Sequence, residues 1–265
     1  MIPRIIHYCW FGGNQLPPLA VQCIKSWQKY CSDYKIIEWN ENNFNIDYNT
    51  YVKEAYEAKK WAFVSDVARL WALVSYGGIY MDTDCELLKP IDIFLEHDAV
   101  SGFESETYIP TALMGCRVGF TLFKELLTEY DTRSFKLPNG EYDITTNVAS
   151  ITNKLLNYGL VLNNKKQTIS GFTIYPFEYF CPKDFFTGKL NITSNTYAIH
   201  HFDGSWLNKD TKRRLEKHRH FRNRYGDMLG GILCKIYNAW DIYRIDGLNG
   251  LINQLEKKFR PVQLP

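Results

Sequence analysis

The 265-residue sequence has little that would place it in a membrane or in an oxidising compartment. No stretch reaches the roughly 18 uninterrupted apolar residues that a membrane-spanning helix needs. The N-terminal segment MIPRIIHYCWFGG has only a short apolar run and lacks the small-residue cleavage site of a signal peptide. The seven cysteines form no CxxC pair and follow no regular spacing, which argues against a zinc site or a disulfide framework. We therefore expect a cytoplasmic protein, either soluble or peripheral on the inner face of the cytoplasmic membrane.

The sequence also lacks a large net charge, since the formal value is +2 at pH 7. A nucleic-acid partner is therefore not expected. Apolar residues make up 45% of the chain, enough for a substantial core, and the length fits one large domain or one domain with an appendage. The positive charge is unevenly placed, because residues 209–224 hold eight Lys or Arg against two acidic residues.

The N-terminal third begins with the pattern of a β-α-β unit. Residues 4–10 are typical of a strand that ends at Gly12-Gly13, residues 19–30 of a helix, and residues 34–39 of a second strand. In α/β domains, ligands bind beyond the carboxyl ends of such strands. An α/β fold is therefore expected, with Trp10 and the two glycines at the ligand-binding edge.

A second helix and strand lead to the most informative motif. Apolar residues recur at helical spacing across residues 51–76, and Gly77-Gly78 provides the left-handed position at which a helix ends. Residues 79–81 then predict a short buried strand that delivers Asp82 and Asp84 to its end. Strand alternation would point both carboxylates to one side, or a tight turn would gather them.

Two carboxylates this close repel each other unless a cation lies between them. Hard oxygen ligands suit Mg²⁺ or Mn²⁺, which complete their coordination with phosphates and water. The alternative is a solvated acidic turn, but the position of Asp82-Thr83-Asp84 directly after a buried strand favours a metal site.

Two further pairs are candidates for the same cleft. Asp66 and Arg69 lie three residues apart and share one helix face, where they form either a surface ion pair or a polar lining of the cleft. His200 and His201 end a predicted late strand at residues 197–202. Imidazole ligates Mn²⁺, and strand alternation allows only one of the two to face a given side; a hydrogen-bonded structural histidine is the alternative.

The C-terminal residues have a different pattern from the rest. Apolar residues from Leu229 to Trp240, and again over 248–259, follow helical spacing directly after the basic stretch. Two interpretations remain open. Residues 209–240 bind an anionic membrane surface, or the helices form a cap or a dimer surface.

Four blocks of sequence together resemble glycosyltransferase family 32, a group of DXD-containing sugar transferases. The blocks are IHYCWFGG at residues 6–13, SDVAR at 65–69, GGIYMDTD at 77–84 and HHFDGSW at 200–206. The family includes the yeast initiating mannosyltransferase and bacterial capsule and surface-polysaccharide enzymes, and the clostridial glucosylating toxins share these blocks. Four blocks in the right order are more specific than any one of them.

The resemblance implies a GT-A catalytic domain over residues 1–206, followed by a basic, amphipathic helical region over residues 207–265. It also implies a nucleotide-sugar donor, Mn²⁺ or Mg²⁺, and retention of anomeric configuration. No second carboxylate is spaced as a glycosidase-type nucleophile, so a front-face mechanism is expected.

The resemblance also implies roles for individual residues. Asp66 and Arg69 would hold the donor sugar, Asp82 would contact the ribose or a metal-bound water, and Asp84 would ligate the metal. His201, preferred from its spacing to Gly204, or His200, which fits the family's Ala-Ile-His pattern, would complete the metal shell. Trp10 would stack on the base, and Ser205 and Trp206 would close over the diphosphate. The remaining residues expected to bind substrate are His7, Tyr8, Phe11, Gly12, Thr83 and Asn147.

The sequence departs from the family pattern in two places. Residues 145–147 read Thr-Thr-Asn where many relatives have Gly-Pro, and residues 111–115 lack an asparagine often found near the sugar. The donor therefore stays open: UDP-galactose or UDP-glucose is favoured, with GDP-mannose as the alternative. The expected acceptor is a saccharide, lipid-linked in surface polysaccharide biosynthesis.

Two other functions compete with sugar transfer. A DxDx(T/V) phosphohydrolase is disfavoured because Glu86 occupies the Thr/Val position and the motif follows a whole β-α-β unit. A non-catalytic sugar-binding protein is disfavoured because both acids are present at 82 and 84.

Overall fold

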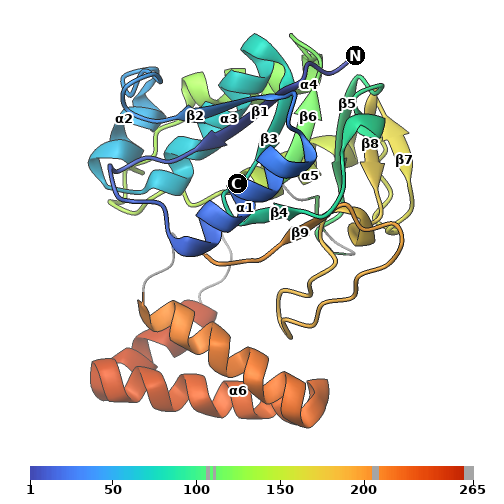
Figure 1. Ribbon diagram of the computed structural model, residues 1–265. Helices are drawn as coiled ribbons and strands as arrows, with labels where there is room; N and C mark the ends of the chain where they lie inside the picture. Colours follow the sequence, from blue (N-terminus) through green and yellow to red (C-terminus); the bar gives the residue numbers. More distant parts are fainter. Residues whose placement is uncertain (106–107, 110–111, 205–208, 260–265) are drawn as a thin grey trace. The chain divides into compact units, whose positions relative to one another are not determined.

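The computed structural model describes residues 1–105, 108–109, 112–204 and 209–259, with side chains as far as residue 250 (Figure 1). The chain divides into two compact units. The first, here called the sheet unit, comprises residues 1–183 and 190–206, and the second, the helical unit, comprises residues 184–189 and 207–265.

The sheet unit is built on a mixed seven-stranded sheet with strand order β2-β1-β3-β6-β5-β8-β7. Strands β1, β2 and β3 are parallel, β6 is antiparallel to both β3 and β5, and β5 is parallel to β8. The carboxyl ends of β1, β3 and β5 therefore lie at one edge of the sheet. The strands are β1 (Ile5–Cys9), β2 (Lys35–Trp39), β3 (Gly78–Met81), β5 (Ala99–Gly102), β6 (Leu113–Cys116), β7 (Gln167–Ile169) and β8 (Phe172–Tyr175).

Side-chain alternation along the strands builds a hydrophobic core on each face of the sheet. In β3, Tyr80 points into one cluster while Ile79 and Met81 point into the other. The Tyr80 cluster is covered by four helices and the Ile79 cluster by α1. The helices are α1 (Pro18–Tyr30), α2 (Thr50–Glu57), α3 (Trp61–Tyr76), α4 (Thr121–Glu129) and α5 (Asn147–Asn157), with short 3₁₀ turns at Asp92–Phe94, Tyr130–Thr132 and Phe177–Tyr179.

A second, two-stranded sheet lies beside α1. It pairs β4 (Cys85–Leu87) with β9 (Ala198–His200) in antiparallel register. The fully buried Trp27 of α1 donates its indole N–H to the Cys85 carbonyl at 2.7 Å. This hydrogen bond fixes the start of β4, and with it the segment that follows Asp84.

The predicted α/β class with a helical C-terminal region is confirmed. One predicted element was wrong: the helix expected over residues 51–76 is two helices, because Lys59 adopts a left-handed conformation with φ of 56° between them. Both helices pack on the same cluster, so the apolar periodicity does not reveal the break. Gly77, with φ of 63°, ends α3 as predicted.

The helical unit contains α6 (Lys209–Phe259), which is interrupted at Gly226 and Gly247, where φ is 72° and 64°. Inside the unit, Asp241 is fully buried and forms ion pairs with Arg213, Arg214 and Arg244. In the part of the chain that the structure describes, no helix combines the length and hydropathy required to cross a membrane.

Candidate functional site

The Asp82-Thr83-Asp84 motif forms a tight turn at the carboxyl end of β3. The Asp82 carbonyl accepts a hydrogen bond from the Cys85 N–H at 2.9 Å, and the Asp82 N–H donates to the Ala112 carbonyl at 2.8 Å. The chain thus reverses between β3 and β4, with the half-buried Thr83 at the turn. Of the two geometries considered from the sequence, the tight turn gathers the carboxylates.

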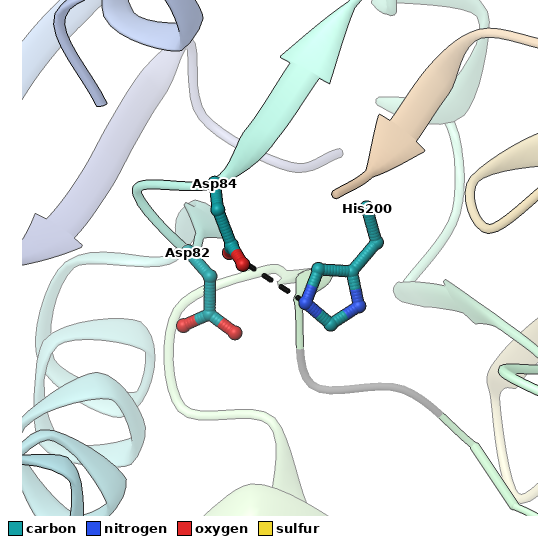
Figure 2. Close-up of side chains that lie close together, drawn as sticks. All are labelled: Asp82, Asp84 and His200. Atoms are coloured by element: carbon teal, nitrogen blue, oxygen red, sulfur yellow. Dashed lines mark ion pairs between the residues drawn. The ribbon is translucent and has the colours of Figure 1, made fainter. Parts of the chain in front are cut away.

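A histidine from a distant strand completes a cluster of three possible metal ligands (Figure 2). The register of the small sheet pairs His200 with Cys85, and His200 Nε2 lies 3.5 Å from Asp84 Oδ1. One ligand atom from each of Asp82, Asp84 and His200 lies within 4.8 Å of the others. Two carboxylates and an imidazole are a donor set that suits Mn²⁺.

The geometry does not support the preference for His201 as the histidine that completes the metal shell. Successive residues of a strand point to opposite sides, so His201 turns away from the aspartates. Its Nε2 lies 2.8 Å from Glu86 Oε2, on the other side of the small sheet. The structure therefore brings His200, and not His201, to the acidic pair.

Within the cluster, the negative charge of Asp84 is balanced by a positive charge on His200. Burial by itself would raise the pKa of Asp84, but the neighbouring His200 and the Asp203 backbone N–H, at 2.8 Å, lower it to about 2. Burial opposes a charged His200, yet Asp84 raises the pKa of that imidazole well above its usual value. The buried Nδ1 of His200 has no hydrogen-bond partner among the described residues. A divalent cation fits this site, because it would supply the positive charge that the imidazole supplies here.

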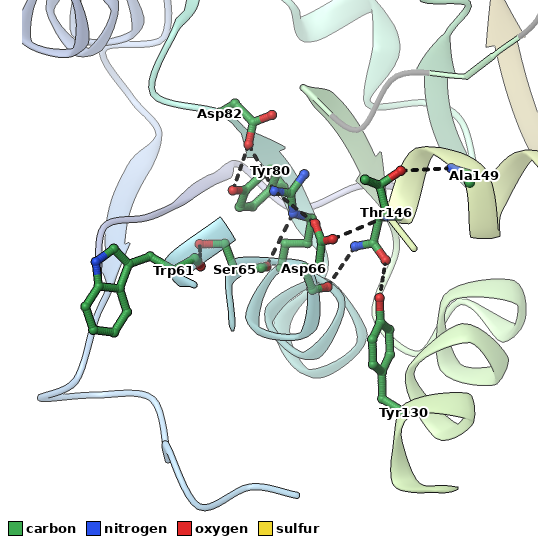
Figure 3. A network of polar contacts seen from close by, with 10 residues as sticks. Trp61, Ser65, Asp66, Tyr80, Asp82, Tyr130, Thr146 and Ala149 are labelled. Carbon is green, nitrogen blue, oxygen red and sulfur yellow. Dashed lines mark hydrogen bonds and ion pairs between the residues drawn. The ribbon is translucent and has the colours of Figure 1, made fainter. Parts of the chain in front are cut away.

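Asp66 and Arg69 belong to the same site (Figure 3). Arg69 Nη2 lies 3.4 Å from Asp66 Oδ1 and 3.2 Å from Asp82 Oδ1, and all three carboxylate and guanidinium groups are mostly buried. The Arg69 guanidinium also lies 4.4 Å from the centre of the Tyr80 ring, and the Tyr80 hydroxyl donates to Asp82 at 3.0 Å. The pair is therefore buried next to the DXD turn and is not a surface ion pair.

Asn147 has a positioning role in this network. Its side-chain amide donates to the Asp66 carbonyl at 2.8 Å and accepts from the Tyr130 hydroxyl at 2.8 Å, while its backbone N–H donates to Asp66 Oδ2 at 3.3 Å. The side chain is 1% exposed. Its predicted direct contact with substrate therefore does not fit the structure, because the amide is committed to protein partners.

Three residues predicted to bind substrate, two in β1 and one just after it, are buried in the core. His7 is fully buried, and its ring nitrogens bond to the Gly77 carbonyl at 2.8 Å and the Trp39 indole N–H at 3.1 Å. Burial also lowers the pKa of His7 to about 4, so it is neutral. Tyr8 donates to Glu38 at 2.7 Å, and Phe11 is buried and packs on Phe44. These three support the loop and do not face a ligand.

Trp10 and Gly12 remain at the sheet edge where the sequence placed them. Trp10 is half-buried and donates its indole N–H to the Asn14 carbonyl at 2.6 Å. Gly12 has φ of 94°, and its N–H donates to Glu41. A Cβ atom at Gly12 would lie 2.6 Å from Trp61 Nε1. Trp61, which is partly buried against the core, is thus a second aromatic residue at this loop.

Glu104 is a carboxylate that the sequence reasoning missed. It follows β5, whose carboxyl end lies at the same edge as that of β3. Burial raises the pKa of Glu104; His200 opposes the shift, and Asp82 and Asp84 add to it. The parallel relation of β5 to β3 was the information needed to find it, and strand pairing is not visible in the local sequence. The remaining predicted residues, Ser205 and Trp206, lie outside the described residues.

Residues 17–101 match the family described as a glycosyltransferase sugar-binding region containing a DXD motif. This range contains Asp66, Arg69, Asp82 and Asp84. The match confirms the family resemblance found in the sequence.

Two curated relatives come from Schizosaccharomyces pombe. Inositol phosphoceramide mannosyltransferase 3 is 29% identical over 123 residues, which cover 44% of this chain, and inositol phosphoceramide mannosyltransferase 1 is 30% identical over 105 residues, which cover 36%. The aligned regions span 34% and 31% of the relatives, so the chain matches about a third of their length.

Two solved structures of glycosyltransferases align with part of this chain. The PaToxG glycosyltransferase aligns with a TM-score of 0.44 and 15% identity over 59% of this chain and 69% of its own. A glycosyltransferase involved in the glycosylation of the major capsid of PBCV-1 aligns with a TM-score of 0.43 and 11% identity over 81% of this chain and 99% of its own.

Proposed function

We propose that this protein is a metal-dependent glycosyltransferase of GT-A type that transfers a hexose from a nucleotide sugar to a saccharide acceptor. The observation that carries the proposal is the cluster of Asp82, Asp84 and His200 at the carboxyl end of β3, within 4.8 Å of one another. The DXD turn of this cluster lies inside the matched family region.

Different residues of the site would bind the metal ion and the sugar of the donor. Asp84 and His200 would hold Mn²⁺ or Mg²⁺, with Asp82 contributing directly or through water. When bound, this ion supplies Lewis-acid stabilisation of the charge that develops on the leaving diphosphate. Arg69 forms ion pairs with both Asp66 and Asp82, and it would hold the two carboxylates in fixed positions when a donor sugar binds.

Retention of anomeric configuration is part of the proposal, with the acceptor attacking on the same face as the leaving phosphate. Asp66 and Glu104 are two further carboxylates that interact electrostatically with the cluster. Asp66 is held by Arg69 and Asn147, whereas the Glu104 carboxylate makes no hydrogen bond or ion pair with the described residues. Glu104 is therefore the better candidate to contact the transferred sugar.

The donor expected from the sequence is UDP-galactose or UDP-glucose. GDP-mannose is the second candidate, and the names of the two curated relatives, both mannosyltransferases, support it. The proposed acceptor is a lipid-linked saccharide of surface polysaccharide biosynthesis. The ceramide named for the relatives is consistent with an acceptor that carries a lipid.

The decisive experiment incubates the protein with a panel of UDP- and GDP-sugars and Mn²⁺, and measures nucleotide release and the anomer of the product by NMR. Metal-dependent release of one nucleotide with a retained anomer is expected. Release of inorganic phosphate from a sugar phosphate would instead support a phosphohydrolase. Donor binding with no turnover against any saccharide or lipid-linked acceptor would support a sugar-binding protein.

A further inference from the structure

The second segment of α6 presents exposed apolar side chains along one face. Leu229, Ile232, Ile236, Trp240 and Tyr243, here called the apolar stripe, are each 51–61% exposed. They are spaced three or four residues apart, which at 100° per residue places all five within a narrow arc of the helix. Exposed apolar residues that gather in this way mark an interaction surface.

The opposite face of the same segment already packs inside the helical unit. Cys234, Asp241 and Ile242 are buried there, and a Cβ atom at Gly230 would lie 2.8 Å from the Phe221 carbonyl oxygen. His218 of the first segment also bonds to Asn238 at 2.8 Å. The described core of the helical unit is therefore formed without the apolar stripe.

The charges around the apolar stripe are positive. Lys235 and Arg244 are exposed and flank it on its two sides. Asp241 is the only acidic residue between 228 and 245, and it is fully buried among three arginines. Over residues 209–250 the chain carries ten Lys or Arg against five Asp or Glu. The surface that presents the apolar stripe thus has cationic edges, and the exposed carboxylates of the segment, Asp227 and Asp246, lie at its two ends.

We propose that the apolar stripe binds the headgroup region of a bilayer that contains anionic lipids, with the helix parallel to the membrane plane. Aromatic residues with an adjacent arginine suit this depth, and Arg244 lies 5.5 Å from the centre of the Trp240 ring. Lys235 and Arg244 would meet lipid phosphates. A second copy fits less well, because paired stripes would bring these cations close to their own counterparts. This inference does not depend on the proposed catalytic function.

The test is flotation of the full chain with two kinds of vesicle, phosphatidylcholine alone and phosphatidylcholine with about one third phosphatidylglycerol. Binding to the anionic vesicles at low salt, weakened by added salt, is expected. The double variant Ile236→Ser/Trp240→Ser should lower the partition coefficient at least about tenfold. The matched control Ile93→Ser/Val118→Ser changes residues that are 56% and 53% exposed in the sheet unit, and it should bind like the unchanged protein.

A second measurement locates the contact. Lipids brominated near the headgroup should quench part of the tryptophan fluorescence, and Trp240→Phe should remove most of that quenching while circular dichroism stays unchanged. The proposal is overturned by absence of binding to anionic vesicles at low salt, or by a folded stripe variant that binds as well as the control. If the protein does not bind vesicles but sediments as a dimer, and Ile236→Ser/Trp240→Ser makes it a monomer, the apolar stripe would instead bind a second copy of the chain.

Discussion

Arg69 Nη2 lies 3.2 Å from Asp82 Oδ1, and this ion pair joins helix α3 to the DXD turn. Asp82 therefore already has a buried cationic partner in the protein. Asp84 has only His200, at 3.5 Å, as a charged neighbour among the ion pairs of the described residues. The two acids of the motif are thus unequal in their charged neighbours.

This inequality predicts different effects of two similar substitutions. Asp84→Asn should weaken Mn²⁺ binding at least about 100-fold, and Asp82→Asn by only about tenfold, because Arg69 reduces the charge that Asp82 offers the metal. Titration calorimetry with Mn²⁺ would measure both. The exposed Asp131→Asn is the control and should bind metal normally. Equal losses for both variants, or none for Asp84→Asn, would contradict this division of roles.

The two adjacent histidines give a second prediction. His200→Ala should reduce Mn²⁺ affinity at least about tenfold, because it removes an imidazole from the cluster. His201→Ala should change the Mn²⁺ affinity by less than about twofold. It removes only the contact between the imidazole and Glu86, and a contact of this kind contributes little to stability. Electron paramagnetic resonance of bound Mn²⁺ would distinguish them. A larger effect from His201→Ala would restore the assignment made from spacing alone.

Asn147 provides a prediction about stability. Asn147→Ala removes the buried amide that donates to the Asp66 carbonyl and accepts from the Tyr130 hydroxyl, so it should lower the free energy of unfolding by about 2–4 kcal/mol. Urea unfolding would measure this loss. The neighbouring Ser150→Ala, which changes a half-buried residue of the same helix, should cost less than about 1 kcal/mol. Similar losses for the two variants would show that Asn147 does not hold Asp66.

Local pattern was enough to predict the parts of the site that lie close together in the chain. The helix end at Gly77 and the turn after β3 follow from neighbouring residues. The choice of His200 over His201 depends on the pairing of β4 with β9, more than a hundred residues apart in sequence. The position of Glu104 depends in the same way on strand order. The position of Trp61 next to Gly12 could not be predicted, because helical periodicity does not reveal which residues of a helix lie next to a distant loop.

The pH dependence of stability should reveal the buried Asp66. Burial raises its pKa to about 6 from an ordinary value of 3.8. The folded state therefore binds this proton more tightly than the unfolded chain does, so its stabilising effect is complete below about pH 4 and is lost as pH rises through 6. Relative to Asp66→Asn, the unchanged protein should gain about 1–3 kcal/mol between pH 7 and pH 4. Urea unfolding of both proteins at each pH would test this, and parallel pH profiles would contradict it.

The close approach of Gly12 and Trp61 can be separated from backbone strain by a matched pair of substitutions. Gly12 and Gly13 both have positive φ, 94° and 66°, but a Cβ atom would lie 2.6 Å from the Trp61 indole at Gly12 and would contact nothing within 4 Å at Gly13. Gly13→Ala should therefore cost only the strain, about 1–2 kcal/mol, and Gly12→Ala should cost more than this.

Trp61→Phe removes the indole nitrogen that the new methyl group would meet. In that background, the cost of Gly12→Ala should fall by about 1 kcal/mol, while the cost of Gly13→Ala should stay the same. Urea unfolding of the six proteins completes both double-mutant cycles. Zero coupling between positions 12 and 61 would mean that the indole is free to move away, and Trp61 would then be poorly placed to support a ligand at this loop.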